Sequence, residues 1–281
     1  VAHDYRGRLV YELLQNADDA MAGLAGTADR VAFVVTDDAL WVANNGRPLD
    51  DADVLGLCGL GASSKIDARG RRRASIGHKG LGFKSVLEIT DRPAVWSTLH
   101  SFELGAHQAR PGIDALWAEH RRAPPLRVPS MRFPAELTNR PPRWEAFSAE
   151  GFHTAFCFPF RDDIDREERA AIASRLLELP PTAVLFLKHL ERIDVRVETQ
   201  AVTRSLTWMI ERTVHDGDSW LTVPGLVTSG LYRFGLRRND EPVRTFLVGH
   251  DSEVVIGEHR VGLSGPAWEG VELAEVSVAV A

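Results

Sequence analysis

Cysteine, lysine and long apolar runs are all scarce in this chain of 281 residues. The two cysteines, Cys58 and Cys157, lie far apart and match no metal-ligand spacing. We therefore expect two small buried thiols, and neither a disulfide framework nor a zinc site. No apolar run approaches the roughly 18 residues of a membrane span, and no signal peptide is recognisable. The sequence thus predicts a cytoplasmic protein without a membrane segment.

Acidic residues outnumber basic ones, 39 to 33, which gives a formal net charge of -6. This balance disfavours a nucleic-acid-binding surface along the whole chain. Only the stretch Arg69–Arg73 and the Arg/Pro-rich residues 120–143 would suit DNA, so we expect no nucleic-acid partner. Only four of the 33 basic residues are lysines, and three of them, Lys65, Lys79 and Lys84, fall within twenty positions. The compact lysine ammonium is thus concentrated in one segment.

Hydrophobic periodicity predicts a first, mixed unit and a second, β-rich one. We expect helices over 5–22, 51–60, 83–89, 167–179 and 182–190, and strands over 31–35, 40–43, 94–98, 152–160 and 192–197. Six of the fifteen prolines lie in residues 120–143, which predicts an irregular surface insertion. From about residue 200 the pattern changes to short β-like segments broken by Gly, Asp and Asn.

Three polar residues of the first predicted helix share one narrow stripe, because residues four and seven positions apart lie on the same helix face. They are Glu12, Asn16 and Asp19. The stripe borders the apolar arc, so we expect it at the edge of the core. The expected solvent face holds Tyr11, Gln15 and Asp18. A carboxylate, an amide and a second carboxylate in line suit a base, a metal ligand and an orienting group, although a solvated polar face is the alternative.

Two further segments combine glycine with polar residues. Gly77, Gly80 and Gly82 precede a predicted helix, with Lys79 between them. Free backbone N–H groups and a helix N-terminus suit an anion such as phosphate, although a tight structural turn is an alternative. The segment Asn44-Asn45-Gly46 ends a predicted strand and, taken alone, indicates a plain turn.

Together these segments resemble the GHKL ATPase superfamily of gyrase B, heat-shock chaperones, histidine kinases and MutL, and in particular sacsin-type chaperone-like ATP-binding domains. The resemblance covers about residues 1–198. It is carried by ELLQNADDA (12–20), VANNGRPLDDADVLGLCGLGASSK (42–65), IGHKGLGFKSV (76–86), TAFCFPFR (154–161) and LFLKHLERIDVRV (185–197). It implies an α+β fold, a two-layer α/β sandwich of the Bergerat type with helices on one face of a mixed sheet over 1–198. Residues 199–281 would begin a smaller β-rich domain.

By the same resemblance, the helical stripe takes part in catalysis. Glu12 would be the general base that activates water, and Asn16 would supply an oxygen to Mg²⁺. Asp19 would organise the pocket. Phosphate-side residues would be Gly77, Gly80, Gly82, Phe83, Lys65 and Lys79, with His78 a surface residue of the lid.

Base recognition would involve Asn44, Gly46 and Thr154. Many relatives carry an aspartate where this chain has Asn44. An Asn oxygen can accept from adenine N6 and its amide can donate to N1, whereas the rotated amide can face guanine. The choice between ATP and GTP therefore stays open. Gly46 would let the backbone pass close to the base, with Thr154 as the polar contact behind it.

The resemblance implies Mg²⁺-dependent ATP binding and slow hydrolysis that drives lid closure in a chaperone-like or clamp-like larger protein. The alternative is a nucleotide-gated interaction or regulatory module with negligible turnover. Because the chain opens at Val1 almost directly into a helix, we expect a piece of a longer polypeptide. An unidentified protein client, and a homodimer formed through other segments, are the partners that this reading leaves open.

Overall fold

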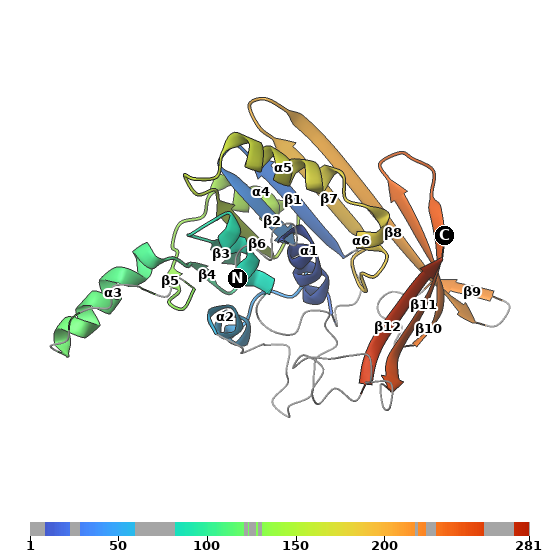
Figure 1. Cartoon of the computed structure of the whole chain (residues 1–281), viewed down its shortest axis with the longest axis horizontal. Helices are drawn as coiled ribbons and strands as arrows, with labels where there is room; N and C mark the ends of the chain where they lie inside the picture. The colour runs from blue at the N-terminus through green and yellow to red at the C-terminus, as the bar shows by residue number, and fades with distance from the viewer. Residues whose placement is uncertain are drawn as a thin grey trace.

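A computed structural model describes residues 9–22, 29–59, 82–120, 123, 128, 131–216, 219–222, 229–255 and 273–280 (Figure 1). Its helices are α1 (Leu9–Ala20), α2 (Asp51–Cys58), the 3-10 helix η2 (Gly82–Glu88), α3 (Ala106–Glu119), α4 (Pro142–Ala149), α5 (Arg166–Leu177) and α6 (Pro181–Val184). None of these helices is both long and apolar enough to cross a membrane.

The strands are β1 (Arg30–Thr36), β2 (Ala39–Asn44), β3 (Ala94–Ser97), β4 (Ser101–Glu103), β5 (Ala135–Glu136), β6 (Thr154–Pro159), β7 (Arg192–Glu198), β8 (Thr203–Asp216), β9 (Ser219–Thr222), β10 (Ser229–Arg238), β11 (Arg244–Val255) and β12 (Leu273–Val280). They form one sheet in the order β12-β11-β10-β8-β7-β1-β2-β6-β3-β4-β5, with β9 beside β8. β1 and β7 pair in parallel, whereas β2 is antiparallel to both β1 and β6. The sheet is therefore mixed, and the predicted α+β sandwich is confirmed.

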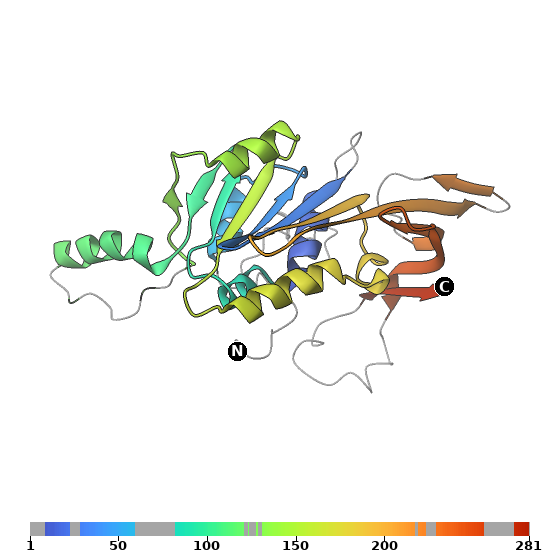
Figure 2. The ribbon, with the colours of Figure 1, turned by 90° about the horizontal axis from the view of Figure 1, so that it is seen from above.

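The two faces of the sheet bury different cores. Alternate residues of β1 point to opposite faces: Phe33 belongs to the larger core with α1 and α5, whereas Val34 belongs to a smaller one. Trp144 and Phe147 of α4 close the smaller core. Figure 2 shows α4 and α5 on opposite sides of the sheet. Besides the expected layer of helices on one face, a short helix thus covers part of the other.

Several predicted boundaries were wrong. The helix expected over 182–190 ends at Val184, and the next residues form turns and coil. Helix α3, which projects away from the sheet in Figure 1, was not predicted. It contains Pro111 and buries only Ala109 and Ile113, so its apolar stripe is short and interrupted. Helix α4 begins inside the segment that we expected to be irregular.

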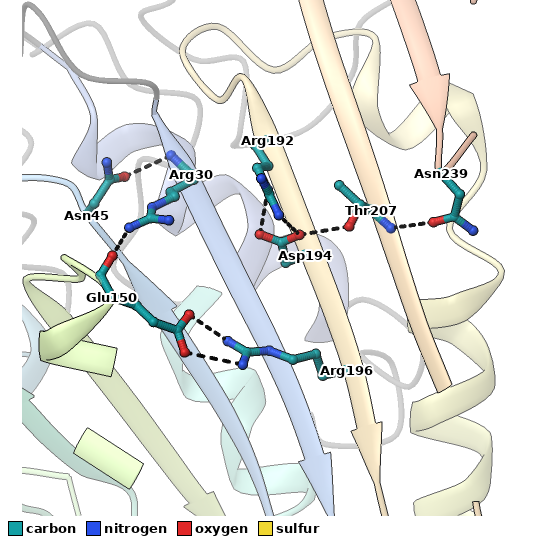
Figure 3. Close-up of polar contacts among 8 residues, drawn as sticks. All are labelled: Arg30, Asn45, Glu150, Arg192, Asp194, Arg196, Thr207 and Asn239. Atoms are coloured by element: carbon teal, nitrogen blue, oxygen red, sulfur yellow. Dashed lines mark hydrogen bonds and ion pairs between the residues drawn. The ribbon is translucent and has the colours of Figure 1, made fainter. Parts of the chain in front are cut away.

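The sheet continues without a break across residue 198. Strand β8 pairs with β7 along its first seven residues, and polar side chains link these strands to the β10–β11 turn (Figure 3). Asp194 pairs with Arg192 at 2.7 Å and accepts a hydrogen bond from Thr207 at 2.8 Å. Asn239, in the left-handed region at φ 50°, accepts the Thr207 N–H at 2.8 Å. The boundary at 198/199 stays a prediction, but the strands on its two sides are directly bonded.

Both cysteines are free thiols, as expected. Cys157 is buried in the smaller core, whereas Cys58 is half-buried at the end of α2. Burial raises the pKa of both thiols above the ordinary value, which makes them poor nucleophiles at neutral pH.

Candidate functional site

The polar stripe of α1 lies at the edge of the core, as predicted. Glu12, Asn16 and Asp19 are all half-buried. On the neighbouring face of the helix, Leu14 and Ala17 are buried. These two apolar residues fix the rotation of α1, so the stripe borders the core along the helix.

The end of β2 brings two predicted site residues together. Asn44 of β2 stands opposite Thr154 of β6, and Thr154 stands opposite Ser97 of β3. Asn44 is 4% exposed and Thr154 1%. The hydroxyls of Thr154 and Ser97 lie 3.0 Å apart. Because β6 runs antiparallel to both neighbours, the ends of two strands and the start of a third place an amide and two hydroxyls in a row.

Gly46 joins this row to the C-terminal end of α1. A Cβ at Gly46 would lie 2.6 Å from the carbonyl oxygen of Ala20, which no ordinary contact permits. The Arg47 N–H donates to that same oxygen at 2.9 Å. The approach of two backbones therefore requires a glycine here, a packing reason that stands beside the role expected from the resemblance.

The phosphate-side residues are only partly within the described structure. Gly77, Gly80, Lys65 and Lys79 lie outside the described residues, as does His78. Gly82 begins η2, which packs beside α1.

Phe83 of η2 belongs to the larger core. Its side chain is 8% exposed, and its ring lies 5.6 Å from that of Phe156 and 6.0 Å from that of Phe158. These aromatic contacts explain a phenylalanine at position 83 by packing. They also tie the start of η2 to β6, the strand that carries Thr154.

Asp18 does not lie on the solvent face, contrary to our prediction. Its side chain has no exposed surface. The carboxylate accepts three backbone N–H groups, from Lys188 to Oδ2 at 2.8 Å and from His189 and Leu190 to Oδ1 at 2.9 and 2.8 Å. These bonds hold residues 188–190 out of the helix that their sequence predicts. The available signal was position: Asp18 follows the fully buried Leu14 by one turn.

Arg212 of β8 holds the same segment from its carbonyl side. Its Nη2 donates to the carbonyl oxygens of Leu187 at 3.0 Å and Leu190 at 2.8 Å. Its guanidinium carbon lies 5.0 Å from the ring centre of Phe234 on β10. Backbone groups of 187–190 thus connect α1, through Asp18, to β8 and β10.

Several charged groups lie near this segment. Burial, followed by the charges of Glu191 and Asp18, raises the pKa of Asp29 to about 6. Burial also lowers the pKa of His189. Burial thus shifts Asp29 and His189 toward their neutral forms.

The oxygen donors of the stripe suit a hard cation. An amide flanked by carboxylates offers only oxygen ligands, which Mg²⁺ prefers, and Mg²⁺ commonly takes one or two protein oxygens together with waters and phosphates. Within the described ranges, no group of three or more His, Cys, Asp or Glu side chains could hold a metal. The side-chain oxygen of Asn16 suits one ligand position of such a cation.

Comparison with known proteins identifies the family. A sequence model of the sacsin domain matches residues 1–207. The chain belongs to the sacsin domain family. The sacsin domain match includes α1, the end of β2 and β6, the three elements that converge at the candidate site.

A curated relative of this sacsin domain is Protein NO VEIN of Arabidopsis thaliana. It is 28% identical over 188 residues, which are 66% of this chain. The aligned part is 6% of that protein's length.

Proposed function

We propose that this sacsin domain is a GHKL-type site that binds Mg²⁺–ATP and hydrolyses it slowly, and that the nucleotide drives closure within a larger chaperone-like or clamp-like protein. The observation that carries the proposal is the convergence of α1 with the ends of β2 and β6. It joins a buried amide and hydroxyl to the polar stripe of α1, which bears two carboxylates and an amide.

The two ends of α1 would contact different parts of the nucleotide. Ala20 contacts Gly46 beside Asn44 and Thr154, so this end would take the base. Glu12 lies about 12 Å away along the helix axis, at 1.5 Å per residue. That separation suits the reach from a purine to its terminal phosphate, where Glu12 would orient and deprotonate the attacking water. Mg²⁺, held by Asn16 and the phosphates, would neutralise the phosphate charge.

Binding is tested by calorimetric titration of the chain with ATP, with and without Mg²⁺. We expect binding that requires Mg²⁺ and is weakened at least about tenfold by Asn16→Ala, since a lost metal ligand removes a strong interaction. Gln15→Ala is the matched control, because Gln15 is also a half-buried amide on α1. Equal loss in both variants, or Mg²⁺-independent binding, would contradict the assignment of Asn16.

Hydrolysis is tested separately by single-turnover measurements on Glu12→Gln. We expect this variant to keep ATP binding and to lose hydrolysis by about 10²-fold or more, as for removal of a general base. Unchanged hydrolysis would exclude Glu12 as the base.

The alternative is a nucleotide-gated interaction module with negligible turnover. It is favoured by one observation: the aligned region is a small part of a much longer relative, so other segments could act on the nucleotide state. ATP binding by the wild-type chain without measurable single-turnover hydrolysis would support this alternative. A protein client, and any homodimer, would then depend on the bound nucleotide and not on its hydrolysis.

A further inference from the structure

The orientation of the Asn44 amide is fixed by its own turn. Oδ1 of Asn44 lies 3.1 Å from the backbone nitrogen of Gly46. A backbone N–H can only donate, so the atom that meets it must be the amide oxygen and not the nitrogen. The other arm of the side chain, Nδ2, is therefore a donor, and it has no hydrogen-bond partner among the described residues.

The neighbouring hydroxyls can act as donors or acceptors. Ser97 Oγ accepts the Leu49 N–H at 3.1 Å and lies 3.0 Å from Thr154 Oγ1, where either oxygen can be the donor. It can also donate to the His153 carbonyl oxygen at 3.4 Å. A hydroxyl rotates to suit its partner, so Thr154 can present a donor or a lone pair to a group beside Asn44.

We propose that this site accepts 6-oxopurine nucleotides such as ITP and GTP as well as ATP. This proposal rests on the proposed function. The Nδ2 donor of Asn44 can meet either N1 of adenine or O6 of an oxopurine. Thr154 can accept from the protonated N1 of an oxopurine. A carboxylate at position 44 offers only acceptors. It would place a negative oxygen against the partially negative O6 and so reject oxopurines.

ITP is the sharpest probe, because its base carries an oxo group and a protonated N1 where adenine carries an amino group and a bare N1. We expect calorimetric titration with Mg²⁺–ATP and Mg²⁺–ITP to give dissociation constants within about tenfold of each other, the worth of roughly one net hydrogen bond. GTP, which adds only the 2-amino group, should bind with the same affinity as ITP within about tenfold.

Asn44→Asp replaces the Nδ2 donor by a carboxylate oxygen, which can only accept, and keeps an acceptor for the Gly46 N–H. We expect this variant to keep ATP binding within about tenfold of the wild type, because the new carboxylate oxygen loses the bond to N1 but can accept from the adenine N6 amino group. It should bind ITP at least about tenfold more weakly than the wild type does, because a buried lone pair then opposes O6. Asn45→Asp is the matched control. This substitution makes the same chemical change one residue away, at a side chain whose Oδ1 accepts the Arg30 N–H at 2.8 Å. The Asn45→Asp variant should have the same ratio of ITP to ATP affinity as the wild type.

The outcomes separate this proposal from the proposed function. If the wild-type chain binds no nucleotide, both the proposed function and the proposed base tolerance are wrong. If it binds ATP about 100-fold more tightly than ITP, the ATP site stands and base tolerance is overturned. If Asn44→Asp and Asn45→Asp keep the same ratio as the wild type, Asn44 does not select the base. Thermal melting of each variant distinguishes lost affinity from lost folding.

Discussion

Replacing Asp18 by alanine should destabilise the fold more than any change on the exposed side of α1. The three backbone N–H groups of 188–190 would lose the acceptor that the fully buried Asp18 carboxylate provides. Each buried, unpaired donor costs about 1–3 kcal/mol, but such penalties do not add fully because the segment can relax. We expect a loss of about 3–5 kcal/mol, as found when a buried charged partner is removed.

Asp18→Asn gives an internal check on this reasoning. Oδ1 accepts two of the three N–H groups and Oδ2 accepts one. An asparagine with its oxygen at the Oδ1 position keeps two bonds and turns an NH₂ group toward the Lys188 N–H. One donor is then unpaired, so the expected loss is about 1–3 kcal/mol, smaller than for alanine.

Urea unfolding followed by tryptophan fluorescence measures both variants, with Gln15→Ala as control. Gln15 is half-buried on the same helix, and its replacement should change the free energy of unfolding by no more than about 0.5 kcal/mol. An Asp18→Ala variant within about 1 kcal/mol of the wild type would refute the structural role of the carboxylate. Equal losses for the alanine and asparagine variants would refute the division of the hydrogen bonds between its two oxygens.

Three further predictions test other parts of the structure. Gly46→Ala should lower the unfolding free energy by about 2 kcal/mol or more, because its Cβ would lie 2.6 Å from the Ala20 oxygen; urea unfolding measures this, and an unchanged midpoint would contradict the close approach. Phe83→Ala should cost about 3–5 kcal/mol, as for a buried phenylalanine, whereas a ligand-contacting ring outside the core would cost far less in the same assay. Because the pKa of Asp29 is raised to about 6 from 3.8, the folded state binds its proton more tightly, and stability from this group falls as pH rises from about 4 to about 6. Asp29→Asn should remove that fall, as measured by urea midpoints at pH 4.5 and pH 7; an unchanged difference between the two midpoints would assign the pH dependence to other groups.

Local sequence patterns were sufficient to predict the strands around the site and the polar stripe of α1. The apolar runs of β1 and β2 and the motif at Asn44 lie within short segments, so the sequence could predict them. The family resemblance assigned Asn44 and Thr154 to the same predicted site, but it did not predict that they lie opposite each other in neighbouring strands. Their separation in sequence hides this pairing from any periodic pattern.

Asp18 and the segment after α6 could not be predicted in the same way. Whether Asp18 faces solvent depends on backbone donors about 170 positions later, and residues 185–190 have an apolar pattern that suits a helix. A long-range hydrogen bond overrode local preference in both places. Helix α3 was missed for a different reason, since Pro111 lies inside it and few of its residues are buried.

A crystal structure with Mg²⁺ and a non-hydrolysable ATP analogue tests the central claim most directly. We predict a purine within hydrogen-bond distance of Asn44 and Thr154, with the Asn16 side-chain oxygen on Mg²⁺ and Glu12 facing the terminal phosphate. A nucleotide bound at another surface, or a purine that touches neither Asn44 nor Thr154, would contradict the account.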